Sequence, residues 1–89
     1  MSVYIVLGED SYETRFGDGY YGYFKGAFFT RDKAEEFLRT PPPGFDSYHI
    51  KTIALRLNGK AFVIETNTLS PSDTVCVEDV VTGLTLDVV

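Results

Sequence analysis

The segment FGDGYYGYFKGAFF, residues 16–29, carries seven of the thirteen Tyr and Phe residues of the chain. Its glycines at positions 17, 19 and 22 also spell G-x-G-x-x-G. A dinucleotide-binding loop of that pattern has to follow a strand and open a helix, whose N-terminus holds the pyrophosphate. Here the glycines lead into Tyr-Tyr-Gly-Tyr-Phe, which has the aromatic composition of a strand. The segment therefore predicts a glycine-rich turn that runs into an aromatic strand.

Alternation divides the predicted strand, residues 20–29, into two faces. The face with Phe24 alternates aromatic residues and glycines, and we expect it to lie in the core. The face with Tyr21 and Tyr23 carries polar tips on apolar rings, which suits a sheet margin, a protein interface or the stacking of a sugar or base. The interaction surface predicted from this strand consists of Tyr20, Tyr21, Tyr23 and Lys25.

The residues before and after this strand predict three further elements. Residues 3–8 are apolar on both alternating faces, which is typical of a central strand covered from both sides. Residues 9–19 are polar and contain glycine, so we expect a long mobile loop. Thr30 is a predicted N-cap for a short helix over Arg31–Arg39 with an apolar stripe, and three consecutive prolines end it.

The second half of the chain predicts strands only. Tyr48–Leu57 is expected to form a strand that returns through an Asn58–Gly59 turn as Ala61–Glu65. The tail predicts a β-hairpin, with strands at Val75–Val81 and Leu84–Val89. We therefore predict one α+β domain over residues 1–89, arranged β-β-α-β-β plus this hairpin, with a mixed or mainly antiparallel sheet in the order 2-1-3-4. One short helix covers one face, so the hairpin, a partner or a second copy has to cover the other.

Composition limits the classes of function. The chain of 89 residues has a net charge of −5, most of it in the last third, so direct nucleic-acid binding is not expected. Cys76 is the only cysteine and excludes an intramolecular disulfide, which fits a reducing compartment. No segment has the length of a membrane span or the flanking charges of a signal peptide. We expect a cytoplasmic protein.

Candidate catalytic and metal-binding groups are sparse. His49 is the sole histidine, so no cofactor or metal site is predicted. A Cys76–His49 nucleophilic pair is formally possible, but Val75-Cys76-Val77 is the setting of a small buried hydrophobe. The acidic segment with Glu9, Asp10, Glu13 and Asp18 reads as a solvated loop. A pocket next to these carboxylates or next to His49 is the arrangement that would favour an enzyme, which we do not expect.

Three stretches support a resemblance: Val3–Val6, Phe28–Phe37 and Tyr48–Lys51. Over residues 3–57 the chain resembles short bacterial and phage β-β-α-β proteins of unknown function, with the pattern V-Y-x-V, F-x-[ST]-x-x-x-A-E-x-F and Y-x-I. The matching residues describe a strand–helix junction and carry no site. The resemblance implies an accessory protein of a bacterium or phage.

The function predicted from these features is that of a small non-enzymatic binding protein. Its partner is another protein or a second copy of itself, contacted through a face of the β-sheet. The alternative is a phage-type inhibitor whose acidic surface occupies a basic groove on a nucleic-acid-handling enzyme.

Overall fold

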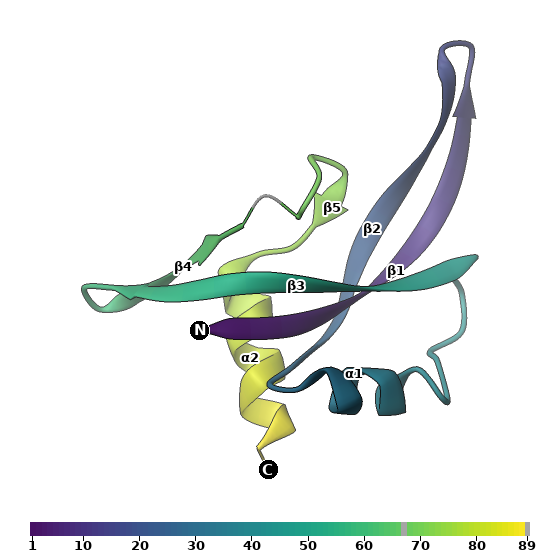
Figure 1. Ribbon diagram of the computed structural model, residues 1–89. Helices are drawn as coiled ribbons and strands as arrows, with labels where there is room; N and C mark the ends of the chain where they lie inside the picture. The colour runs from purple at the N-terminus through teal and green to yellow at the C-terminus, as the bar shows by residue number, and fades with distance from the viewer. Residues whose placement is uncertain (67, 89) are drawn as a thin grey trace.

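The computed structural model describes residues 1–66 and 68–88 (Figure 1). It has an α+β fold with a five-stranded mixed sheet and two helices, which confirms the predicted class. The elements in chain order are β1 (Ser2–Thr14), β2 (Gly17–Phe28), α1 (Arg31–Phe37), β3 (Ser47–Asn58), β4 (Ala61–Glu65), β5 (Asp73–Thr74) and α2 (Val77–Asp87).

Strand β1 lies at the centre of the sheet, whose order is β4-β3-β1-β2-β5. It pairs antiparallel with both β2 and β3, while the two-residue β5 pairs parallel with β2. Val3, Ile5 and Leu7 on one face and Val6 on the other are all fully buried. The prediction of a central strand covered on both faces is confirmed.

The predicted C-terminal hairpin is wrong, because residues 77–87 form helix α2. β-branched valines suggested strands, but Val77, Val80 and Leu84 recur at helical spacing, and Val80 and Leu84 are buried against the sheet. Gly83, predicted as a turn residue, lies inside the helix with the Cβ of Ala27 close to it. Helix α2 therefore covers the sheet face that the sequence left without a cover.

The predicted loop over residues 9–19 is also wrong. β1 and β2 continue through it as a two-stranded hairpin that extends beyond the other strands (Figure 1). Gly17 follows the turn with a φ of 128°, a conformation that glycine adopts without strain. Helix α1 ends at Phe37 rather than at Arg39, and its N-cap is Thr30 as predicted, since the Thr30 hydroxyl accepts from the Lys33 N–H.

A β-bulge changes which residues of β2 share a face. The register with β1 shifts between Val6 and Leu7, so that no residue of β1 lies opposite Lys25 in the strand pairing. As a result Phe24 lies on the same side as Ala27, in the core under α2, whereas Phe28 lies on the opposite side against Phe37 of α1. The uniform alternation expected for residues 20–29 is therefore wrong beyond Phe24.

Candidate functional site

The sheet separates the residues of the predicted interaction surface. Tyr21 and Tyr23 lie on the α1 side, and the Lys25 ammonium reaches the same side, where it lies 4.3 Å from the centre of the Phe45 ring. Tyr20 pairs across the hairpin with Ser11 and lies on the α2 side. Three of the four predicted residues thus share a face, and Tyr20 does not.

The α1 side of the hairpin carries two groups of aromatic rings in contact, which together we call the tyrosine surface. Tyr12 and Tyr21 have ring centroids 4.6 Å apart, Tyr23 and Phe45 5.7 Å apart, and Phe45 and Tyr48 5.9 Å apart. Tyr21 remains 47% exposed and Tyr23 38% exposed. The tyrosine surface consists of Tyr12, Tyr21, Tyr23, Phe45 and Tyr48.

Two glycines make room for these rings. A Cβ atom on Gly8 would lie 2.7 Å from the Phe45 ring, and one on Gly19 would collide with the Tyr12 side chain. Because these glycines have no side chain, the Phe45 ring packs directly on the strand backbone at Gly8, and the Tyr12 ring does so at Gly19. The glycines of the opening segment shape a surface rather than a phosphate-binding loop.

The loop after α1 brings Phe45 onto the hairpin because the next residue is anchored to β1. The Asp46 carboxylate accepts from the Ser11 hydroxyl at 2.8 Å and from the Ser11 N–H at 3.2 Å, and the Asp46 N–H donates to the Glu9 carbonyl. The two hydrogen bonds from Ser11 lower the pKa of Asp46. These bonds position the Phe45 ring over Gly8.

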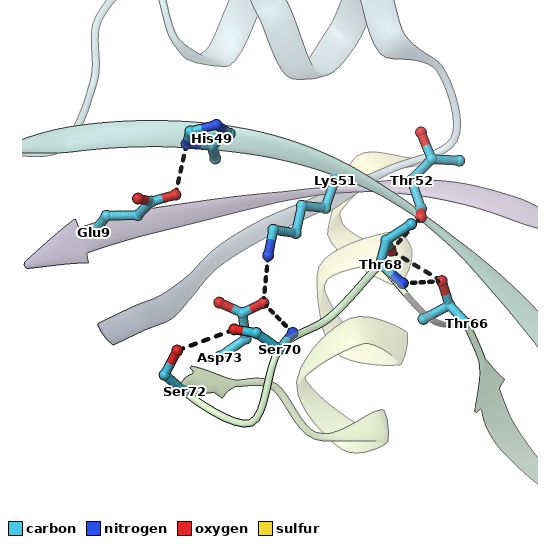
Figure 2. Close-up of polar contacts among 9 residues, drawn as sticks. All are labelled: Glu9, His49, Lys51, Thr52, Thr66, Thr68, Ser70, Ser72 and Asp73. Atoms are coloured by element: carbon cyan, nitrogen blue, oxygen red, sulfur yellow. Dashed lines mark hydrogen bonds and ion pairs between the residues drawn. The ribbon is translucent and has the colours of Figure 1, made fainter. Parts of the chain in front are cut away.

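The α2 side of the sheet carries a second candidate site, a polar pocket of about 300 Å³ beyond the N-terminal end of α2. It lies between strands β1, β2 and β3 and the segment that leads into β5 (Figure 2). We call it the polar pocket. Its lining residues are Glu9, Tyr20, Gly22, His49, Lys51, Ser70, Ser72 and Asp73.

An ion pair at the base of the polar pocket fixes the segment before α2 to the sheet. The Lys51 ammonium lies 2.6 Å from the Asp73 carboxylate, and the Ser70 N–H donates to the same oxygen at 2.8 Å. Burial raises the pKa of the Asp73 carboxyl, but the contacts with Lys51 and Ser70 outweigh it, so the pKa lies below its ordinary value. The other carboxylate oxygen rests on Gly22, where a Cβ would collide with it.

A second polar contact lies at the rim of the pocket. His49 Nδ1 lies 2.6 Å from a Glu9 carboxylate oxygen, with the imidazole 61% exposed and the Glu9 side chain 13% exposed. A carboxylate in this position fixes the ring and leaves Nε2 directed elsewhere. The Ser70 and Ser72 hydroxyls bond each other at 3.0 Å. In the part of the chain that the structure describes, no hydrogen bond joins His49 to a hydroxyl group.

Cys76 does not occupy the buried position expected for it. It is exposed at the N-cap of α2, where its thiol donates to the Asp79 carboxylate at 2.9 Å. This hydrogen bond raises the pKa of the Cys76 thiol, so it disfavours the reactive thiolate.

The described residues, 1–66 and 68–88, have two properties that concern metal ions and membranes. No group of three or more His, Cys, Asp or Glu side chains within these ranges is placed to hold a metal ion. Neither described helix is long and apolar enough to span a bilayer.

Sequence patterns do not reveal the polar pocket, because its residues come from four strands and a loop. His49 and Lys51 lie two residues apart and so share a strand face, which is the one available signal. Glu9 was assigned to a loop, although it is in fact a paired strand residue opposite Ser47. No protein-family model, curated protein or solved structure matches this chain.

Proposed function

We propose that this chain is a non-enzymatic binding protein that contacts a protein partner through the tyrosine surface. The observation that carries the proposal is that two groups of ring contacts, Tyr12 with Tyr21 and Phe45 with both Tyr23 and Tyr48, lie on one side of the sheet while Tyr21 and Tyr23 remain exposed. Tyrosines are enriched at protein interfaces because each offers a large apolar area and a hydroxyl at low cost in side-chain entropy.

The rigid support of this surface favours recognition. The rings rest on Gly8 and Gly19, and Asp46 holds the Phe45 loop against β1. A surface that is already ordered loses less conformational entropy when a partner binds. Its aromatic centre has a polar margin that includes Lys25 and Asp46, the arrangement typical of interface cores and rims.

A photo-crosslinking residue at position 21 or 23, compared with position 20, tests the proposal. Tyr20 is a matched control because it is 54% exposed on the same strand but faces the opposite side. We expect crosslinks to one defined protein from positions 21 and 23 only. With the complex reconstituted from purified components, Tyr21→Ser and Tyr23→Ser should each weaken binding about tenfold or more by calorimetry, while Tyr20→Ser changes it less than twofold. Equal effects at all three positions contradict the proposal.

The phage-type inhibitor has less support, because several of the acidic side chains already have basic partners within the chain. Glu9, Asp73 and Asp87 contact His49, Lys51 and Lys33, respectively. An acidic surface that binds a basic groove needs carboxylates that are not already paired with basic side chains of the same chain.

The pocket beside Glu9 and His49 means that a catalytic role also has to be tested. A panel of ester, phosphoester and glycoside substrates serves this purpose, with His49→Ala as the matched variant. Turnover by the wild type that is lost in His49→Ala would overturn the non-enzymatic proposal.

A further inference from the structure

Strand β4 forms one end of the sheet, and its outer edge is not paired with any described strand. Asn58 pairs with Ala61 next to the turn, and Gly59 has the positive φ of 65° that the first central residue of a tight hairpin turn requires. Hydrogen-bonded pairs alternate along an antiparallel ladder, so Ala61, Val63 and Glu65 bond β3. The backbone groups of Phe62 and Ile64 therefore point outward.

Apart from its short length and the charge of Glu65, the edge of β4 lacks the features that usually prevent edge-to-edge association. Its sequence, Ala-Phe-Val-Ile-Glu, contains no proline, no lysine and no bulge. Natural sheets protect exposed edges with such features because free backbone groups pair with other chains. This edge is therefore suited to accept a further strand.

An exposed apolar area adjoins this edge on the α2 side of the sheet. Leu57 is 58% exposed, Phe62 37%, Met1 60% and Val88 68%. Three of them, Met1, Phe62 and Val88, line a groove of about 240 Å³ between α2 and the β3–β4 hairpin, and Leu57 is the cross-strand neighbour of Phe62. A free strand edge and an apolar area thus lie side by side.

We propose that β4 pairs antiparallel with β4 of a second copy of this chain, about a two-fold axis at Val63. In this register Phe62 of each copy faces Ile64 of the other, and the outward backbone groups of both residues form hydrogen bonds. Val63 faces Val63 of the second copy, and Ala61 faces Glu65. No two like charges are opposed, and Lys60 of each copy lies at the same end of the seam as Glu65 of the other.

The size of a stable interface requires that α2 takes part. Specific interfaces bury about 800 Å² per partner, far more than a five-residue strand edge supplies. The same rotation brings the Leu57, Phe62 and Val88 regions of the two copies to one face of the joined sheet. One operation therefore satisfies the open edge and places the two apolar areas on the same face of the joined sheet, and it makes no use of the tyrosine surface.

The position of Val63 on the axis gives a direct test by size-exclusion chromatography with light scattering. We expect a dimer for the wild type. Val63→Lys and Val63→Glu should each be monomeric, because like charges would meet on the axis, and an equimolar mixture of the two should form a dimer. Phe16→Lys, at the exposed tip of the other hairpin, is the control and should remain dimeric. A monomeric wild type at all concentrations, or a mixture that stays monomeric, overturns the proposal.

A second pair of variants decides the question if the Val63 variants lose their far-UV circular dichroism. Phe62→Val and Phe62→Pro both remove the ring, but only proline removes the outward N–H and leaves the β3 ladder intact. We expect weaker dimerisation of Phe62→Pro than of Phe62→Val. Equal association of the two variants overturns the edge pairing.

Discussion

At the residue scale, glycine and aromatic side chains act together in this protein. Gly8, Gly19 and Gly22 do not form a sequence motif, but each lies under one specific side chain. These side chains are Phe45, Tyr12 and Asp73, respectively. Two of the three glycines in the G-x-G-x-x-G pattern take part in this packing. Gly19 supports Tyr12 on the α1 side of the hairpin, and Gly22 supports Asp73 on the α2 side. The spacing of the letters carries no information about phosphate binding without the strand–helix context.

Tyr48 offers a test of packing at the end of the tyrosine surface. Its hydroxyl is buried and has no hydrogen-bond partner among the described residues, while its ring contacts Phe45. Tyr48→Phe should therefore raise the free energy of unfolding by about 1 kcal/mol, because the cost of burying an unpaired hydroxyl is removed. The measurement is urea denaturation, with Tyr20→Phe as the exposed control that should show no change. A loss of stability in Tyr48→Phe would contradict the prediction.

Asp73 should make stability depend on pH in the acidic range. Its pKa is lower in the folded chain than the ordinary value of 3.8, so its contribution is complete above that value and is lost as the pH falls through the folded-state pKa. Asp73→Asn should remove about 1.5–3 kcal/mol at neutral pH, the usual range for hydrogen bonds to charged groups, and flatten the profile below pH ~4. Denaturation at a series of pH values checks this, with Glu36→Gln as an exposed control. An unchanged acid profile in Asp73→Asn would contradict it.

At the element scale, α2 shows how tertiary burial overrides local preference. Valines at 77, 80 and 81 favour a strand by propensity, but the sheet face with Ile5, Leu7 and Ile53 has to be covered. A helix places Val80 and Leu84 together on that face, and Gly83 lets it approach Ala27 closely. Local sequence does not contain this requirement; it follows from the whole sheet.

The elements with strong local signals were predictable, and those set by distant residues were not. The first part of β1 (residues 3–8), the Thr30 cap and the β3–β4 hairpin each have a signal within a few residues. The bulge at Lys25 has none, because it depends on the register with Val6 and Leu7 across the hairpin. The polar pocket likewise depends on Lys51 meeting Asp73 through the fold of the intervening chain.

Asp87 should be a main determinant of how α2 ends. A carboxylate in the last turn opposes the helix dipole, but Asp87 is 5% exposed, lies 3.2 Å from the Lys33 ammonium and accepts from the Phe29 N–H at 3.1 Å. Asp87→Ala should cost about 1–3 kcal/mol, and Asp87→Asn less, because an amide oxygen still accepts from Phe29.

Hydrogen exchange at the Phe29 amide separates the two contacts of Asp87. Asp87→Ala should accelerate exchange there, whereas Lys33→Met, which removes the contacts of the ammonium with the Asp87 carboxylate and carbonyl but keeps the Phe29 hydrogen bond, should have a smaller effect. Equal acceleration by both variants would show that Lys33 rather than the Phe29 hydrogen bond fixes the end of α2.

At the scale of the whole molecule, the proposed surfaces occupy separate regions. The molecule measures 44 × 30 × 16 Å, and Figure 1 shows the distal end of the β1–β2 hairpin far from the β3–β4 turn. The tyrosine surface lies on the β1–β2 hairpin together with Phe45 just before β3 and Tyr48 at its start, whereas the β4 edge lies beyond the other end of β3. A dimer through β4 would therefore leave both tyrosine surfaces accessible. Two copies of one surface in a rigid frame bind a repeated or dimeric partner with an effective concentration that a monomer lacks.

The ring of Phe45 over Gly8 has a consequence for how this sequence can change over time. Any side chain at position 8 takes the space of the ring, so a substitution there is tolerated only with a smaller residue at position 45. The opposite order of substitution is tolerated, because replacing Phe45 with a smaller residue first leaves room for a later side chain at position 8. In related sequences we expect the two positions to vary as a linked pair, with glycine persisting wherever the aromatic ring is retained.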